Sequence, residues 1–340
     1  MKNNKIFSAV IDYFLILSAI IGVGFASGKE IYEFFFVFDG GSLLGILAFG
    51  LLYVYLFFVI DYIKHKLELN SYNEFNTAIF GKLTKITNVF IIINFSITCA
   101  GMLAGADYLF ATFFGLKFKI ASLVISAITF LVILGGIGKI KSVSNIIIPI
   151  MIASIVINSF ANITPQNVNM QISTHSSFMA IYYGLLFGVN NFVAALPVLF
   201  ETKQKKSGRI FVIISIAIII LLNVLVLASN NYKTDMPMFE ASANVSPWFY
   251  YVYFATLILA LFSTTLICSY NMQSIICKGK KSVFVAIVIV LFNLILSNLG
   301  YNFIVKYLYV ASGIISAIYV IVLIIMITIK LITTKKKNKI

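Results

Sequence analysis

Apolar segments long enough to cross a membrane take up most of this chain. A helix that spans the hydrocarbon of a bilayer needs about 20 predominantly apolar residues. The chain has 340 residues, of which 61% are hydrophobic and only 11% are charged. Soluble domains are about 45–50% apolar and about 25% charged, and could not bury this much apolar surface. We therefore predict an all-α integral membrane protein that lies in the cell membrane.

The apolar segments predict ten membrane spans, of which the first and the sixth are interrupted. They lie near residues 6–38, 42–63, 84–114, 119–136, 142–161, 176–200, 209–229, 247–277, 282–298 and 303–332. The connections are too short for a separate soluble domain, so residues 1–340 are expected to form one transmembrane domain. The connection between the second and third spans is expected to hold a short surface helix.

The distribution of basic residues orients these spans. Most of the 25 lysines and arginines fall in alternate connections and in the two termini. Positively charged connections stay on the cytoplasmic side, which places both termini in the cytoplasm. The net charge of +14 is thereby explained without nucleic acid. Asp12 and Asp61 fall near the same boundary, where we expect them to face lipid headgroups.

The first span is interrupted by the stretch GVGFASGKE, residues 22–30. Glycine disfavours helix by about 1 kcal/mol relative to alanine, and Ser27 and Gly28 can start a second half-helix. Glycines in membrane helices can also serve close helix packing. Lys29 and Glu30 favour an interruption instead, because ionisable groups at this depth are costly and normally face a cavity or a partner. Irregular backbone survives in a membrane only where protein or water surrounds it.

A second interruption is predicted in the sixth span, YYGLLFGVNNFVAALP. Gly184 and Gly188 precede two asparagines, Asn190 and Asn191, which need hydrogen-bond partners in an apolar span. Pro197 then removes one helical donor. The two interrupted spans would be the first and the sixth of ten.

Five spans in each half would make the second half inverted relative to the first. We expect inverted repeats at approximately 6–161 and 176–332. Matching interrupted segments in two halves indicate a transporter's binding site. At each break, free N–H groups face an anion and free C=O groups face a cation. We expect donors around residues 25–28 and 190–192 and acceptors around residues 18–22, a pocket suited to a small zwitterion and a cation.

The candidate substrate-binding residues lie at or beside the two breaks, and three of them are aromatic residues that could cover a ligand. They are Gly22, Val23, Gly24, Phe25, Ala26, Ser27, Gly28, Tyr183, Phe187, Gly188, Asn190 and Asn191.

The stretch GVGFASGKE resembles the GxGFASGxE signature of the YkvI-like bacterial membrane proteins. These proteins resemble the amino acid–polyamine–organocation superfamily, whose LeuT-type fold is a five-plus-five inverted repeat. The length, the ten spans and the cytoplasmic termini agree with that fold, so the resemblance covers nearly the whole chain. The YkvI-like proteins are largely uncharacterised, and the resemblance therefore implies a fold and a bacterial membrane protein more firmly than a substrate.

The resemblance also implies a sodium site between the first and eighth spans. Sodium-coupled members hold the ion with backbone carbonyls beside the first break and with a carbonyl and two hydroxyls of the eighth span. The matching positions are Ser18, Ile21, Ala260 or Leu261, and two of Ser263, Thr264 and Thr265. Hydroxyls in membrane helices also commonly bond to their own preceding turn, which is the alternative interpretation.

The roles of Lys29 and Asp107 leave open which ion, if any, is coupled to transport. Lys29 could pair with Glu30 or Asp107, could recruit a substrate carboxylate, or could replace the ion in a sodium-independent transporter. Some proton-coupled relatives carry a lysine in the fifth span, and this chain has none there, which favours sodium. Asp107, near the outer end of the third span, is either a gate residue or a structural carboxylate. Lys29 and Glu30 are grouped with the coupling-ion residues.

The leading hypothesis is a secondary transporter, a cation-coupled symporter of an amino acid or similar small zwitterion. The alternative is a ligand-sensing membrane subunit similar to those of spore germinant receptors, which bind amino acids together with partner proteins. We expect no enzyme, because the chain lacks a nucleophile–base pair, a phosphate loop and a metal-ligand cluster. No cofactor other than a coupling ion is expected. Substrate identity, stoichiometry and oligomeric state stay open.

Overall fold

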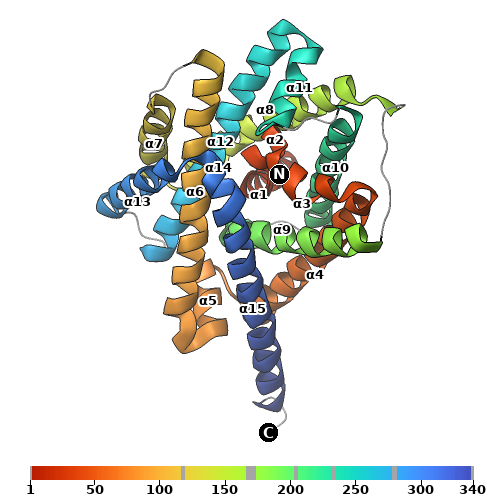
Figure 1. Cartoon of the computed structure of the whole chain (residues 1–340). Coiled ribbons are helices and arrows are strands. Elements are labelled where there is room, and N and C mark those ends of the chain that lie inside the picture. The colour runs from red at the N-terminus through yellow and green to blue at the C-terminus, as the bar shows by residue number, and fades with distance from the viewer. Residues whose placement is uncertain are drawn as a thin grey trace.

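All the regular structure in the described residues is helical (Figure 1). The computed structural model describes residues 2–115, 119–165, 174–202, 206–230, 234–277 and 282–337. Its α-helices are α1 Lys2–Ile20, α2 Val23–Ser27, α3 Lys29–Phe34, α4 Ser42–Lys66, α5 Tyr72–Phe80, α6 Thr84–Phe114, α7 Ile120–Ile133, α8 Ile137–Asn162, α9 Thr174–Phe200, α10 Lys206–Asn230, α11 Pro237–Val245, α12 Pro247–Ile276, α13 Val283–Leu296, α14 Tyr301–Phe303 and α15 Tyr309–Lys337. Short 3₁₀ segments cover Phe36–Gly41, Gly81–Leu83 and Ser297–Leu299, and a π-helical segment covers Ile304–Leu308.

Apolar helices occupy the position of every predicted span. Seven helical stretches in the described part of the chain are long and apolar enough to cross a membrane. Three shorter apolar helices, Ala9–Ile20, Ile120–Ile133 and Val283–Leu299, coincide with the first, fourth and ninth predicted spans. The length and apolar character of these helices confirm the prediction of an all-helical membrane protein.

Large apolar side chains cover the outer faces of the bundle. Leu51 on α4, Ile146 on α8 and Ile295 on α13 are 71%, 65% and 70% exposed. Soluble monomers rarely expose contiguous apolar surface on this scale. These faces are therefore suited to contact with lipid.

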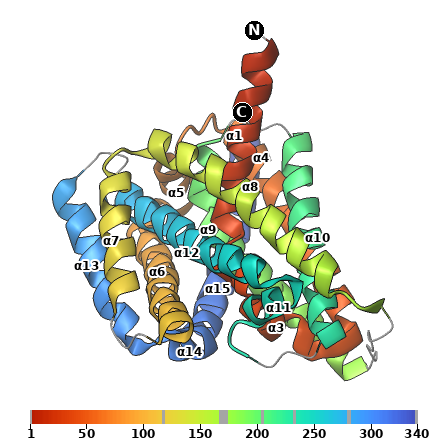
Figure 2. The same ribbon diagram turned by 90° about the horizontal axis from the view of Figure 1, so that it is seen from above.

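The first interrupted span lies at the centre of the bundle. Helix α1 packs against α8, α9, α10 and α12, while α7 and α13 lie side by side at one edge (Figures 1 and 2). Helix α12 lies along both α6 and α8 (Figure 2). The break in this central segment is therefore enclosed by other helices, as irregular backbone in a membrane must be.

The predicted interruption of the sixth span is wrong. Helix α9 is continuous from Thr174 to Phe200, with Pro197 inside its last turn. Its glycines serve packing, since a Cβ atom on Gly184 would overlap the carbonyl oxygen of Gly45 on α4. The carboxamide of Asn191 donates to the Phe187 carbonyl one turn earlier, 3.0 Å away. Polar groups and glycines that suggested a break are thus accommodated by neighbouring helices, and the backbone donors expected near residues 190–192 are not exposed by a break.

Two short helices lie in the connections. The expected helix after the second span is α5, capped by the Ser71 hydroxyl, which accepts from the N–H of Glu74. One face of α5 is buried, so it packs against the bundle. Helix α11 follows the seventh span and contacts α2, α8 and α12. It is held there by Asn158, whose side chain donates to the Met238 carbonyl at 2.8 Å.

Candidate functional site

The backbone of the first span is broken between α1 and α2. The last hydrogen bond of α1 runs from the N–H of Ile21 to the carbonyl of Leu17, and the next runs from the N–H of Phe25 to the carbonyl of Gly22. Within the described residues, the carbonyls of positions 18–21 therefore accept no backbone hydrogen bond, and the N–H groups of Val23 and Gly24 donate none. The predicted acceptors are where expected, but the free donors lie earlier than the predicted range 25–28.

A second turn follows at Gly28. This residue has φ of 79°, a left-handed conformation that glycine adopts at no steric cost. It separates α2 from α3, and the hydroxyl of Ser27 accepts from the N–H of Lys29 at 3.3 Å. The turn folds α3 back on α2, so that the Glu30 carboxyl group lies against Gly24, where a Cβ atom would overlap it. Sequence spacing alone does not bring these two residues together.

A small cavity lies at this break, enclosed by α1, α2, α3, α6, α9, α12 and α15. Its lining includes six predicted residues: Gly22, Val23, Glu30, Asn190, Asn191 and Thr264. The lining also includes Ala19 and Ile20, which lie within the predicted acceptor range 18–22. It is completed by residues that no sequence pattern indicated: Thr98, Met102, Ala194, Cys268 and Tyr309. We call this space the central cavity. The volume open to the centre of a water molecule is about 30 Å³, room for about two waters, so a larger solute requires the surrounding helices to move.

The predicted aromatic residues lie outside the lining of the central cavity. The ring centroid of Phe25 is 5.6 Å from that of Phe187, which also packs on Phe34, Phe35 and Phe49. Tyr183 packs on Phe34 and on Phe38. Gly188 approaches Phe49 and Leu52. These residues join α3 and α9 to α4, and their assignment to the substrate site stays a prediction.

The hydroxyls of α12 bond to their own preceding turn, as the alternative interpretation expected. Ser263 and Thr264 both donate to the Ala260 carbonyl, at 3.0 and 3.1 Å, and Thr265 donates to the Leu261 carbonyl. Their oxygen lone pairs remain available to a cation. Thr264 faces the break, because a Cβ atom on Gly22 would lie 2.5 Å from its hydroxyl oxygen.

Ser18 uses its hydroxyl to join α1 to α8. It donates to the Leu15 carbonyl and to the hydroxyl of Ser144, at 2.8 and 3.1 Å. Only its backbone carbonyl is therefore directed to the break. Among the described residues, no group of three or more His, Cys, Asp or Glu is placed to hold a metal ion, although a sodium site built from carbonyls and hydroxyls needs no such group.

A polar stripe on α15 lies beside the central cavity, and its residue Tyr309 lines that cavity. The side-chain oxygen of Asn190 accepts from Asn94 at 2.8 Å and from Ser312 and Ser316 at 3.1 Å each. The hydroxyl of Tyr309 is buried and has no partner among the described residues. The spacing of Tyr309, Ser312 and Ser316 places them on one helical face, which is a signal that the sequence carries.

Lys29 forms ion pairs on the outer side of the bundle, away from the central cavity. Its ammonium lies 3.1 Å from Asp235 and 3.3 Å from Glu33. The predicted pairing with Glu30 or Asp107 is therefore wrong. Asp235 also accepts from the hydroxyl of Tyr108 at 3.2 Å. We call Lys29, Glu33, Tyr108 and Asp235 the outer cluster.

The outer cluster lies beside a second cavity. This space of about 330 Å³ is lined by Tyr108 and by residues of α11 and the segment before it. Burial acts to raise the pKa of Asp235, but the hydrogen bonds from Lys29 and Asn302 outweigh it and hold the pKa below its ordinary value. The carboxylate is thereby kept charged near neutral pH.

Buried ion pairs close the opposite end of the bundle. Lys141 on α8 lies 3.0 Å from Asp12 on α1 and donates to the Glu201 carbonyl at 2.9 Å. Arg209 on α10 lies 2.7 Å from Asp61 on α4. Asp12, Asp61 and Arg209 are 4%, 6% and 3% exposed, so the prediction that the two aspartates face headgroups is wrong. We call Asp12, Asp61, Lys141 and Arg209 the inner cluster.

Asp107 accepts from the N–H of Ser122 at 2.9 Å. Ser122 lies in the first turn of α7, where free N–H groups favour a carboxylate. This contact supports the structural role, and a gate role stays a prediction.

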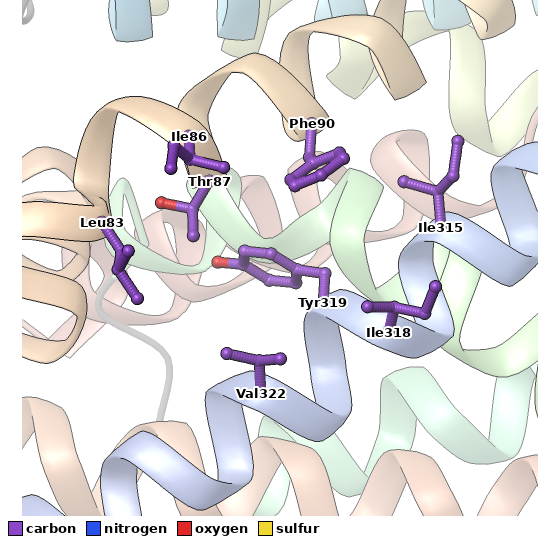
Figure 3. Close-up of a pocket in the computed structure, with 8 residues that line it drawn as sticks. All are labelled: Leu83, Ile86, Thr87, Phe90, Ile315, Ile318, Tyr319 and Val322. Atoms are coloured by element: carbon purple, nitrogen blue, oxygen red, sulfur yellow. The ribbon is translucent and has the colours of Figure 1, made fainter.

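An apolar groove between α6 and α15 is unrelated to the break. Figure 3 shows side chains of both helices facing each other across it. Ile86, Phe90 and Ile318 are more than 40% exposed there. The groove belongs to the outer, apolar surface of the bundle.

No model of a known protein family matches the chain. The uncharacterized membrane protein YkvI of Bacillus subtilis (strain 168) is 24% identical over 326 residues, which cover 90% of this chain and 92% of that protein. The uncharacterized protein YyaD of the same organism is 25% identical over 266 residues, covering 74% of this chain and 76% of that protein. The resemblance to YkvI-like proteins thus extends along nearly the whole chain as homology.

A solved structure shares the fold. It is Mhp1, a nucleobase-cation-symport-1 family transporter, in a closed conformation with bromovinylhydantoin bound. The TM-score is 0.55 at 15% sequence identity, over 87% of this chain and 74% of that one. The broken first span, the central cavity and the clusters at either end therefore belong to a fold that also forms a cation symporter.

Proposed function

We propose that this chain is a secondary active transporter that moves a small solute by alternating access. The observation that carries the proposal is the broken central span, whose free carbonyl and N–H groups meet in a cavity between the inner and outer clusters. A pathway that opens to one side at a time needs such a cavity and a separable contact on each side of it. Homology to a membrane protein and the fold shared with Mhp1 support this function.

The finer features of the proposal come from the sequence. They are ten spans arranged as five-plus-five inverted repeats in one domain, both termini in the cytoplasm, and symport of an amino acid or similar zwitterion with sodium. The sequence indicates as sodium ligands the carbonyls of Ser18 and Ile21, the carbonyl of Ala260 or Leu261, and the hydroxyls of two of Ser263, Thr264 and Thr265. Of these alternatives we propose Ala260, Ser263 and Thr264. The convergence of the last two hydroxyls on one carbonyl supports this set.

Two measurements test the function. Thermal unfolding of the purified protein, screened against amino acids in sodium and in potassium, identifies a ligand because binding to the folded state raises its stability. Uptake of that ligand into proteoliposomes with an imposed sodium gradient then tests transport. We expect Gly24→Leu to abolish uptake and Gly50→Leu to preserve it, since nothing lies within 4 Å of a Cβ atom at Gly50.

Uptake that is unchanged in Gly24→Leu would contradict the assignment of the site. Specific binding without uptake, together with co-purification of a partner protein, would favour the sensing subunit over the transporter.

A further inference from the structure

We propose that Glu30 is a cation-binding residue of the central cavity, which takes a small monovalent cation. This inference rests on the proposed function and adds a charged position to the neutral carbonyl and hydroxyl ligands described above. The cation is either the coupling ion or an ammonium group of the solute, which share the same charge and hydrogen-bonding chemistry toward a carboxylate.

The charge of the Glu30 carboxylate is not balanced within the central cavity. Glu30 is the only ionisable acid or base among its described lining residues apart from Cys268 and Tyr309. The neighbouring Lys29 is directed to Asp235 and Glu33, so it does not neutralise Glu30. No ion pair with Glu30 is found within the described ranges. A carboxylate away from bulk water is costly unless a counter-charge compensates it.

The carboxyl group of Glu30 is positioned at the break. It lies against Gly24, where a Cβ atom would overlap it, and it lines the same cavity as Gly22 and Val23. In broken-helix transporters, the start of the second half-helix faces an anionic group of the substrate. Here the chain itself places a carboxyl group next to that start, and its uncompensated charge calls for a cation.

Unsatisfied oxygens surround the cavity. The buried Tyr309 hydroxyl has no partner among the described residues. Ala19 and Ile20 line the cavity, and their carbonyls accept no backbone hydrogen bond there, while Asn191 uses only its amide nitrogen, toward Phe187. Oxygen ligands of this kind suit a hard monovalent cation or an ammonium group. A space of about 30 Å³ also fits a small ion.

The test is thermal unfolding of the full chain in lipid nanodiscs at constant ionic strength. Lithium, sodium, potassium and methylammonium chlorides are compared with N-methyl-D-glucamine chloride, whose cation is too large for the cavity. We expect at least one small cation to stabilise the protein, with an apparent affinity that falls at least tenfold in Glu30→Gln. Glu68→Gln, which changes an exposed carboxylate outside the cavity lining, is the control and keeps the affinity.

The cations that stabilise the protein show whether the site takes the coupling ion or an ammonium group of the solute. Stabilisation by sodium or lithium that depends on Glu30 indicates the coupling ion, and stabilisation by methylammonium indicates the ammonium group of a solute. If Glu30→Gln does not fold, Gly24→Ala serves instead, because its Cβ atom displaces the carboxyl group and keeps the charge. It should lower the affinity as well.

Two outcomes overturn the inference. One is equal stability in all five salts. The other is sodium stabilisation that survives Glu30→Gln but is lost in Ser263→Ala, which would leave the proposed transporter and its predicted sodium site intact. Conversely, cation binding that depends on Glu30 in a protein without any uptake would refute the transport function alone.

Discussion

Lys141 is the residue whose removal should most directly open the inner end of the central cavity. Its ammonium joins α8 to Asp12 on α1 and to the end of α9 through the Glu201 carbonyl. The side chain of Lys141 therefore links three helices that surround the break. Replacing Lys141 by alanine removes both contacts and leaves the Asp12 carboxylate buried without this partner.

The expected magnitude follows from the exposure of the pair. A hydrogen bond to a charged group contributes about 1.5–3 kcal/mol, and breaking a fully buried ion pair costs about 3–5 kcal/mol. The side chain of Lys141 is 27% exposed and the side chain of Asp12 is 6% exposed, so water weakens the pair and the lower end of these ranges applies. A loss of about 1.5 kcal/mol corresponds to a roughly tenfold change in an equilibrium constant. If the contacts exist only in the closed state, Lys141→Ala raises the population open to the inner side about tenfold.

The native Cys268 reports this change, because it lines the central cavity. In a protein with Cys99→Ser and Cys277→Ser, a small cationic methanethiosulfonate reagent added from the inner side should modify Cys268 about tenfold faster in Lys141→Ala. Lys139→Ala, an exposed neighbour on the same helix, is the control. An unchanged rate, or an equal rise in the control, would refute the role of Lys141 in closure.

Three further results are expected. Arg209→Met should lower the free energy of unfolding by about 3–5 kcal/mol, because the buried Asp61 charge loses its ion-pair partner, and adding Asp61→Leu should recover most of the loss; detergent-titrated unfolding measures both. Gly184→Leu should destabilise the protein by about 1–3 kcal/mol or more through overlap with α4, whereas Gly50→Leu should change the free energy by less than about 0.5 kcal/mol. The lowered pKa of Asp235 means that its contribution is complete above about pH 4 and is lost as the pH falls through the lowered value. The stability difference between wild type and Asp235→Asn should therefore be constant near neutral pH and disappear in acid.

The positions of the helices could be predicted because they depend on local hydrophobicity. The third predicted span, 84–114, coincides with α6, Thr84–Phe114. The break near Gly22 was also predictable, because glycines and charges adjoin within a few residues. Predicting these features requires only the length and polarity of a segment, and both can be read directly from the sequence.

The contacts of the charged residues could not be predicted in the same way. Lys29 reaches Asp235 across more than 200 positions of the chain, and Asp12 and Asp61 find partners on α8 and α10. A carboxylate near the end of a span has the same sequence signal whether it faces headgroups or a buried cation. Only the packing of distant helices decides between them.

The two glycine-containing segments show which local signal distinguishes a break from close packing. Both carry paired glycines and polar residues, yet only the segment with Lys29 and Glu30 is broken. The glycines of α9 let it approach α4, and the carboxamide oxygen of Asn190 accepts from three neutral donors, so α9 keeps its backbone hydrogen bonds. A neutral side chain can be satisfied across a packed interface, but a carboxylate such as Glu30 needs a cation or water. Of these two segments, the one that opens is therefore the one whose glycines adjoin ionisable residues.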